Sequence, residues 1–201
     1  MERRGQWIID VDLRKFFDTI DKGKLRHLLA QRVGDGVIRK MTDKWLKAGV
    51  LEEGRQTKST LGTIQGAVCS PLLANVYLHY ALDEWFYNDV LPRLKRRASL
   101  VRFCDDFVMV FEDYSDCVRV QRVLASRMGR FALTLHEEKT RLIDFRVKRP
   151  QGLANAEATT FNFLGFTHVW GKSRNGKNIV RQHTAKDRYA KALKALNEWC
   201  R

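Results

Sequence analysis

The sequence predicts an α+β fold in which helices flank a mostly antiparallel sheet. An apolar stretch rich in β-branched residues lies at 7–11, and two short apolar strands flank Cys104-Asp105-Asp106. Helical patterns separate these strands and follow them. An order of strand, helices, hairpin, helix and strands is typical of α+β proteins. The length of 201 residues is sufficient for one sizeable core.

The first half of the chain begins with a strand and continues into helices. "WIIDVDLRKFF" predicts a central strand that runs into a turn. Helices are expected over 22–29 and over 37–49, where glycine ends the second pattern. A longer helix should begin at Ser70-Pro71, because Ser is a good N-cap and Pro suits the first helical position, and should extend to about Phe86. The apolar positions of the second helix are Val37, Ile38, Met41, Trp45 and Leu46.

The second half predicts a hairpin, a helix and further strands. The hairpin covers 97–113, and the helix covers 115–130 with Ser115 as its cap. "LTLHEEKTRLIDF" predicts two strands joined by a polar turn, and "FNFLGFTHVW" predicts a short strand pair. The segment 185–201 predicts a basic amphipathic helix.

Charge is the strongest compositional signal. The chain has 37 Lys and Arg residues against 23 Asp and Glu residues, which gives a formal net charge of +14. Such an excess favours a polyanionic partner, most often nucleic acid. The alternative is a merely soluble basic protein.

Neither secretion nor membrane insertion is indicated. No apolar run reaches the length that spans a bilayer, and "MERRGQWIID" lacks the apolar stretch of a signal peptide. The cysteines are too widely separated for a C-x-x-C zinc site or a disulfide framework. We therefore expect reduced thiols, a cytoplasmic location and no membrane partner. The four cysteines are Cys69, Cys104, Cys117 and Cys200.

Two adjacent carboxylates, Asp105 and Asp106, interrupt an apolar hairpin. Unpaired charges at a partly buried site are costly, and a divalent cation would remove that cost. Mg²⁺ in particular is held by one or two carboxylates together with substrate phosphates. Asp12, at the end of the first predicted strand, would join the pair if the strands lie side by side, which would make a two-metal site for phosphoryl chemistry. The alternative is a solvated Asp-Asp turn.

Several blocks resemble those of group II intron reverse transcriptases and occur in the same order. "DVDLRKFFDTID" resembles their first catalytic block, with an Asp, a short gap, an aromatic pair and a second Asp. "LGTIQGAVCSPLLANVYLHYALDEWF" resembles "GTPQGG...SPLLANIYL", and "VRFCDDFVMVF" stands in the place of "RYADDFVI". "LHEEKTRLIDF" and "FNFLGFTHVWGKSRNGK" resemble the next two blocks, so that the similarity covers nearly the whole chain.

The resemblance implies a polymerase palm with two Mg²⁺ ions. Asp12, Asp105 and Asp106 fall on the metal-binding triad, and the backbone carbonyl of Leu13 is expected near the second ion. In the family, one ion activates the primer 3′-hydroxyl and the other binds the incoming triphosphate. Lys139 falls where polymerases place a general acid near the leaving pyrophosphate, although a surface Lys in a turn is the alternative.

Further positions are implied to contact nucleotide or template. Phe17 stands where the family keeps a bulky residue that excludes a ribose 2′-hydroxyl, with core packing as the alternative. Gln65 and Gly66 match a loop that contacts the template and the incoming base, with an ordinary turn as the alternative. Basic residues are expected along the template-primer channel, although such charges are most often solvated. They are Arg96, Arg97, Lys172 and Arg174.

Two features depart from the family pattern near its central motifs. Phe103-Cys104 replaces Tyr-Ala before the Asp pair, which predicts retained metal binding with altered handling of primer or nucleotide. Ile64 and Ala67 replace Pro and Gly in the template loop, which changes the backbone freedom of that loop.

The expected organisation is a palm over 1–168 followed by a palm-to-thumb connection and basic helix over 169–201. The fingers are expected to be largely absent, because the chain starts immediately before the first Asp block. Missing protein segments or a dimer partner would then complete the protein.

The implied function is RNA-directed DNA polymerisation in a group II intron protein that also assists splicing. Its partners would be template or intron RNA, a DNA primer and deoxynucleoside triphosphates. The alternative is a catalytically inactive, truncated RNA-binding remnant. A nucleotidyl cyclase on a related palm would also explain the carboxylates, but it leaves the "SPLLAN" and "FLGF" blocks unexplained.

Overall fold

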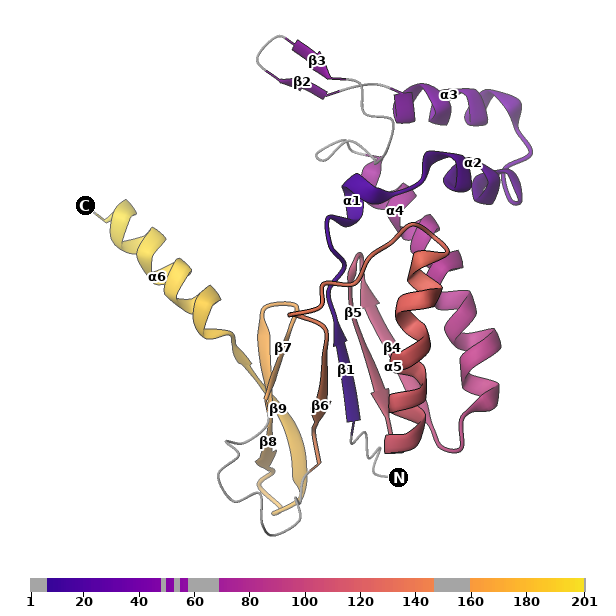
Figure 1. Ribbon diagram of the computed structural model, residues 1–201. Coiled ribbons are helices and arrows are strands. Elements are labelled where there is room, and N and C mark those ends of the chain that lie inside the picture. The colour runs from indigo at the N-terminus through magenta and orange to yellow at the C-terminus, as the bar shows by residue number, and fades with distance from the viewer. Residues whose placement is uncertain (1–6, 48–49, 53–54, 58–68, 147–159, 201) are drawn as a thin grey trace.

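The computed structural model describes residues 7–47, 50–52, 55–57, 69–146 and 160–200 and confirms the α+β class. A four-stranded sheet in the order β4-β5-β1-β6 forms the centre (Figure 1). A second sheet, in the order β7-β8-β9, lies beside it, and a two-stranded sheet joins β2 and β3. The strands are β1 (Trp7–Val11), β2 (Val50–Glu52), β3 (Arg55–Thr57), β4 (Ala98–Phe103), β5 (Asp106–Phe111), β6 (Arg141–Asp144), β7 (Phe161–Phe163), β8 (Phe166–Lys172) and β9 (Asn178–Thr184).

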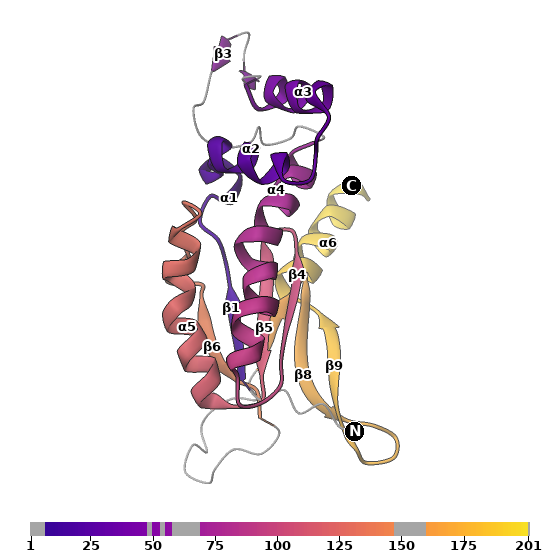
Figure 2. The same ribbon diagram turned by 90° about the vertical axis from the view of Figure 1, so that its right-hand side faces the viewer.

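Helices cover one face of the central sheet. Figure 2 shows α5 and the long helix that starts with α4 side by side in front of β1 and β5. The α-helices are α1 (Phe16–Thr19), α2 (Lys22–Ala30), α3 (Gly36–Lys47), α4 (Ser70–Leu78), α5 (Tyr114–Gly129) and α6 (Lys186–Trp199). Two π-helical segments, η1 (His79–Asp83) and η2 (Trp85–Val90), and a 3₁₀ turn, η3 (Leu91–Arg93), continue α4. The predicted long helix is therefore present and extends past Phe86.

The register of β1 explains why this strand reads as almost continuously apolar. It pairs antiparallel with β5, with Val11 opposite Phe107, and with β6 on its other side. Ile9 belongs to the core beneath the helices, whereas Ile8 packs with Phe161 of the second sheet. Both faces of β1 are covered, as expected for a central strand.

Two predicted helix caps are wrong by one or two residues. Cys69 precedes α4 without a side-chain cap, and Ser70 is already helical. Asp113, rather than Ser115, caps α5, because its carboxylate accepts a hydrogen bond from the backbone N–H of Asp116. A carboxylate at the helix start also interacts favourably with the helix dipole.

The strands after α5 differ from the prediction. In place of a strand beginning at Leu133, the structure has one isolated bridge between Leu13 and Leu135. β9, which was not predicted, pairs with β8 along its whole length. Residue 168 lies inside β8, so this strand crosses the expected boundary between 168 and 169, and the two-part division stays a prediction.

Two amphipathic helices leave apolar side chains exposed. In α3, Leu46 is buried, but the other apolar positions of the predicted helical pattern are 46–68% exposed. α6 extends away from both sheets and buries none of its residues (Figure 1). The apolar period predicts a helix, whereas burial depends on a neighbour. Within the described ranges, no helix is long and apolar enough to cross a membrane.

Candidate active site

A cavity of about 400 Å³ lies at the end of β1, on the face of the sheet away from the helices. The register that places Val11 opposite Phe107 places Asp12 across from Asp106, one residue further on. The turn of the β4–β5 hairpin and the turn between β7 and β8 border the same cavity. The lining residues are Asp10, Val11, Asp12, Asp106, Phe107, Glu138, Lys139, Arg141, Asn162, Phe163 and Leu164.

Asp12 and Lys139 form an ion pair at this cavity. Lys139 Nζ lies 2.9 Å from Asp12 Oδ2, and the Asp12 carbonyl accepts a hydrogen bond from the backbone N–H of His136 at 2.8 Å. The turn that carries Lys139 is thus fixed to the residue with which Lys139 pairs. The predicted proximity of Asp12, Asp106 and Lys139 is present.

Asp10 is a further carboxylate of the site that the sequence interpretation did not assign. It is cross-strand from Arg141, whose Nη2 lies 3.2 Å from Asp10 Oδ2. Burial raises the pKa of Asp10, Arg141 opposes that rise, and the charge of Asp12 adds to it. The spacing Asp10-x-Asp12 placed both side chains on one face of a strand, and this was the signal available in the sequence.

Negative charge accumulates around Asp106. Partial desolvation and the charges of Asp105, Asp12 and Asp10 raise the pKa of Asp106, and Arg188 lowers it. Neighbouring carboxylates raise one another's pKa because ionising each of them adds repulsion. The site therefore favours a positive ligand or counter-ion.

The "FLGF" block forms the opposite wall of the site through a two-residue hairpin turn. Phe163 pairs with Phe166, and the turn residues Leu164 and Gly165 have φ values of 52° and 80°. Both positive values are those of a type I′ turn, which glycine adopts without strain. The Arg188 side chain passes over Gly165, 3.6 Å from the position a Cβ would take. Arg188, which the sequence interpretation also missed, is brought to Asp106 by this packing.

The donor set fits Mg²⁺ in its chemistry. Carboxylate oxygens are the ligands that this hard cation prefers, and three of them, from Asp10, Asp12 and Asp106, face one cavity. In the described ranges, no three His, Cys, Asp or Glu side chains are grouped closely enough to hold a metal ion by themselves. Asp12 instead takes its positive partner from Lys139.

The other residues expected near the reacting atoms lie outside the cavity lining or outside the described residues, and their roles stay predictions. Asp105 is in the hairpin turn next to Asp106, outside the cavity lining. Leu13 has its side chain in the core, and Phe17 is partly buried against Phe16 with ring centroids 5.2 Å apart. Gln65 and Gly66 lie outside the described residues.

The predicted basic contacts are far from the carboxylates. Arg96 and Arg97 precede β4, at the opposite end of this strand from Asp105 and Asp106. Lys172 ends β8 and Arg174 follows it, at the far end of the hairpin that begins beside the site (Figure 1). The structure therefore does not bring these four residues to the cavity, and their role in binding stays a prediction.

Comparisons with known proteins agree with this geometry. Residues 1–168 match the family described as reverse transcriptase (RNA-dependent DNA polymerase). Protein YkfC of Escherichia coli (strain K12) is 28% identical over 226 residues, which cover 97% of this chain and 56% of YkfC. Group II intron-encoded protein LtrA of Lactococcus lactis subsp. cremoris is 40% identical over 81 residues, 40% of this chain and 13% of LtrA. The chain thus spans about half of YkfC and less of LtrA.

A solved structure supports the fold. Telomerase from Candida albicans, in complex with a TWJ fragment of telomeric RNA, superposes with a TM-score of 0.57 at 14% identity. The match covers 82% of this chain and 29% of the telomerase chain. At this identity the similarity concerns the fold alone, which is that of a polymerase palm.

Proposed function

This chain belongs to the reverse transcriptase family, as a relative of the group II intron-encoded proteins, and we propose that it extends a primer on an RNA template. The reaction joins the primer 3′-oxygen to the α-phosphorus of a deoxynucleoside triphosphate and releases pyrophosphate. The observation that carries the proposal is the placement of Asp12 across from Asp106, at one cavity, within a cluster of carboxylates.

Mg²⁺ would be held by Asp12, Asp105 and Asp106, with the Leu13 carbonyl near the second of two ions. When bound, such ions activate a hydroxyl and neutralise phosphate charge. Asp10 and Arg188 adjust the local charge, because each one acts on the pKa of Asp106 from within the same site. Lys139 donates a proton to the pyrophosphate oxygen as the P–O bond breaks, and its place in the lining of the cavity supports this role.

We assign selection of the nucleotide and the template to Phe17, Gln65 and Gly66. We assign exclusion of the ribose 2′-hydroxyl to Phe17. This residue lies in α1, the short helix that follows Asp12 in the chain. Gln65 and Gly66 would contact the template and the incoming base. The net charge of +14 supports binding of RNA and of the primer strand.

In the longer protein, this domain would also bind intron RNA and assist its splicing in the cytoplasm. The similarity to a protein named as group II intron-encoded supports this part of the proposal. The competing function is an RNA-binding remnant without turnover, which the ion pair between Lys139 and Asp12 favours, since this pair occupies a carboxylate oxygen.

Primer extension on an RNA template, with deoxynucleotides and Mg²⁺, separates the two functions. Asp106→Ala should abolish extension, whereas Glu198→Ala, a matched loss of one carboxylate at an exposed position of α6, should not. RNA binding, measured by fluorescence anisotropy over a range of salt concentrations, should persist in both variants. A folded parent that binds RNA but never extends the primer would identify the remnant.

A further inference from the structure

Arg102 occupies an unusual position at the end of an apolar stripe. In β4, Ala98 and Leu100 pack on the helical core, and Arg102 is the next residue on that face. Its side chain is 13% exposed. A charged side chain so deeply covered requires compensating partners.

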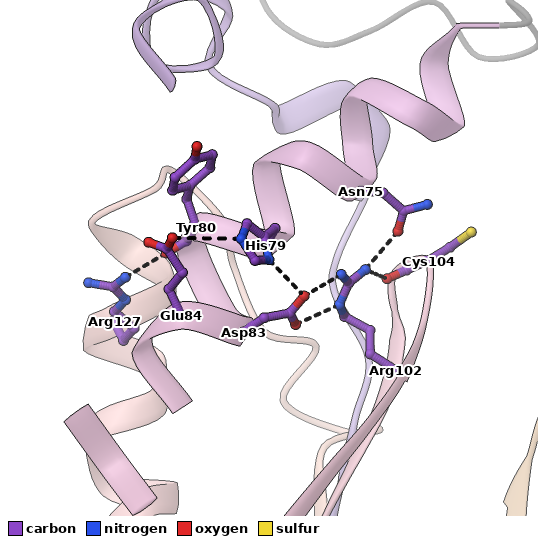
Figure 3. Close-up of polar contacts among 8 residues, drawn as sticks. All are labelled: Asn75, His79, Tyr80, Asp83, Glu84, Arg102, Cys104 and Arg127. Atoms are coloured by element: carbon purple, nitrogen blue, oxygen red, sulfur yellow. Dashed lines mark hydrogen bonds and ion pairs between the residues drawn. The ribbon is translucent and has the colours of Figure 1, made fainter. Parts of the chain in front are cut away.

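Those partners come from the long helix behind the sheet. Arg102 Nε donates to Asp83 Oδ1 at 2.9 Å and Nη2 donates to Asp83 Oδ2 at 2.6 Å, in a two-pronged arrangement (Figure 3). Nη1 donates to Asn75 Oδ1 at 2.7 Å. Fork-shaped pairs of this kind combine strength with a defined direction.

The π-helical segment η1 makes this convergence possible. Asn75 and Asp83 are eight residues apart, whereas a regular α-helix returns to nearly the same face after about seven. η1 accommodates the additional residue. On its other side, Arg127 donates to the carbonyl of Tyr80 at 2.8 Å (Figure 3). It also donates to the carbonyl of Ala81 at 2.8 Å.

A fourth contact connects Arg102 to the turn that bears the carboxylates. Nη1 also donates to the carbonyl oxygen of Cys104 at 3.0 Å. Cys104 has a φ of 53°, in the left-handed region that non-glycine residues rarely adopt. The peptide group that begins with this carbonyl ends at the nitrogen of Asp105, so fixing it fixes the direction in which the turn leaves β4.

We propose that Arg102 is a positioning residue that fixes the turn carrying Asp105 and Asp106, and so directs Asp106 into the cavity, by holding the Cys104 carbonyl, with Asp83 and Asn75 orienting its guanidinium. This inference rests on the proposed polymerase function. The ion pair with Asp83 by itself would join β4 to the helix. The hydrogen bond from Arg102 to the Cys104 carbonyl does not join β4 to the helix, because both residues belong to the same hairpin. This hydrogen bond therefore acts on the conformation of the hairpin turn.

The test uses variants that keep the charge or the shape of the cluster. Arg102→Lys retains a cation beside Asp83, but it cannot donate to three acceptors from one plane. Asp83→Asn keeps the size of the acceptor and removes its charge. Both should lower kcat by about 10–100-fold with KM for the nucleotide nearly unchanged, as is typical when a supporting contact of a site is lost.

Arg127→Ala is the matched control. It removes the hydrogen bonds that a guanidinium donates to carbonyls of η1, and it leaves the contacts of the hairpin turn unchanged. It should lower Tm and leave kcat within about threefold of the parent at a temperature where every variant is folded.

Amide hydrogen exchange gives a readout that does not depend on polymerisation. Exchange at Asp105 and Asp106 should accelerate at least tenfold in Arg102→Lys, relative to the amides of β1, and should stay at parental rates in Arg127→Ala. Unchanged exchange at the turn in a folded Arg102→Lys variant would overturn the proposal, and so would faster exchange with an unchanged kcat. Faster exchange in a protein whose parent extends no primer would uphold the contact with the turn and reject the polymerase function instead.

Discussion

A substitution of Lys139 distinguishes two roles for this residue: an ordinary surface ion pair with Asp12, or proton transfer during the reaction. Its side chain is 63% exposed, and that of Asp12 is 33% exposed. An ion pair so open to solvent contributes about 0–1 kcal/mol to stability. For a domain of this size, 1 kcal/mol corresponds to about 2–4 °C in Tm, so Lys139→Gln should lower Tm by no more than about 4 °C.

The expected effect on turnover is much larger. Loss of a general acid lowers a rate by about 10²–10⁴-fold, which is the decrease in kcat that we expect for Lys139→Gln. Single-nucleotide extension on an RNA template, with single-turnover mixing, measures this step. Lys139→Arg retains the positive charge beside Asp12 but holds its proton too firmly to donate it, so it should be almost as slow as Lys139→Gln.

Three results would contradict this reasoning. If Lys139→Gln keeps kcat within about threefold of the parent, the residue is only a counter-ion of Asp12. If Lys139→Arg has the full parental rate while Lys139→Gln is slow, the residue at this position contributes its positive charge and not a proton. A decrease in Tm far above 4 °C would show instead that the pair is structural.

Further predictions concern the charge, the pocket and the turn of the site. The pKa of Asp106 is raised in the folded state, so the ionised form of Asp106 opposes folding. Asp106→Asn should therefore increase the free energy of unfolding at pH 7, by less than about 1 kcal/mol because this side chain is exposed. This increase should become smaller as the pH falls toward 3.8, the ordinary pKa of an Asp side chain. Urea unfolding from pH 7 to pH 4 measures this, and a gain that grows at low pH would contradict it. Phe17→Ala should increase incorporation of ribonucleotides by about tenfold or more, scored by alkali-sensitive extension products, and unchanged selectivity would assign Phe17 to packing alone. Gly165→Ala should lower the free energy of unfolding by about 1–2 kcal/mol because of its positive φ. Gly129→Ala, where a Cβ meets nothing within 4 Å, should not lower it, and equal losses at both positions would disprove the role of backbone strain.

Local patterns in the sequence predicted the parts of the fold that depend on few neighbours. β1, the β4–β5 hairpin and α5 follow from apolar periodicity and from turn residues within each segment. The same patterns placed Asp12 and the Asp105-Asp106 pair at strand ends. Their opposition required only that β1 and β5 pair in one register, which burial of both faces of β1 enforces.

Caps and helix faces were predicted less well, since several residues compete for each cap and since an apolar face does not specify its partner. Asp113 is one residue from Tyr114, where α5 begins, and its carboxylate caps the helix in place of the Ser115 hydroxyl. Trp45 fits the period of α3 and is nevertheless 46% exposed.

By itself, the sequence determined the class of the fold, the carboxylates at the strand ends and the family to which the chain belongs. The tertiary structure alone decided which further charges meet: Arg188 with Asp106, and Arg102 with Asp83. It also placed Arg96 at the end of β4 opposite Asp105 and Asp106. The reason is physical, because an ion pair depends on the separation of two side chains in space, and that separation follows from long-range packing that no local pattern contains.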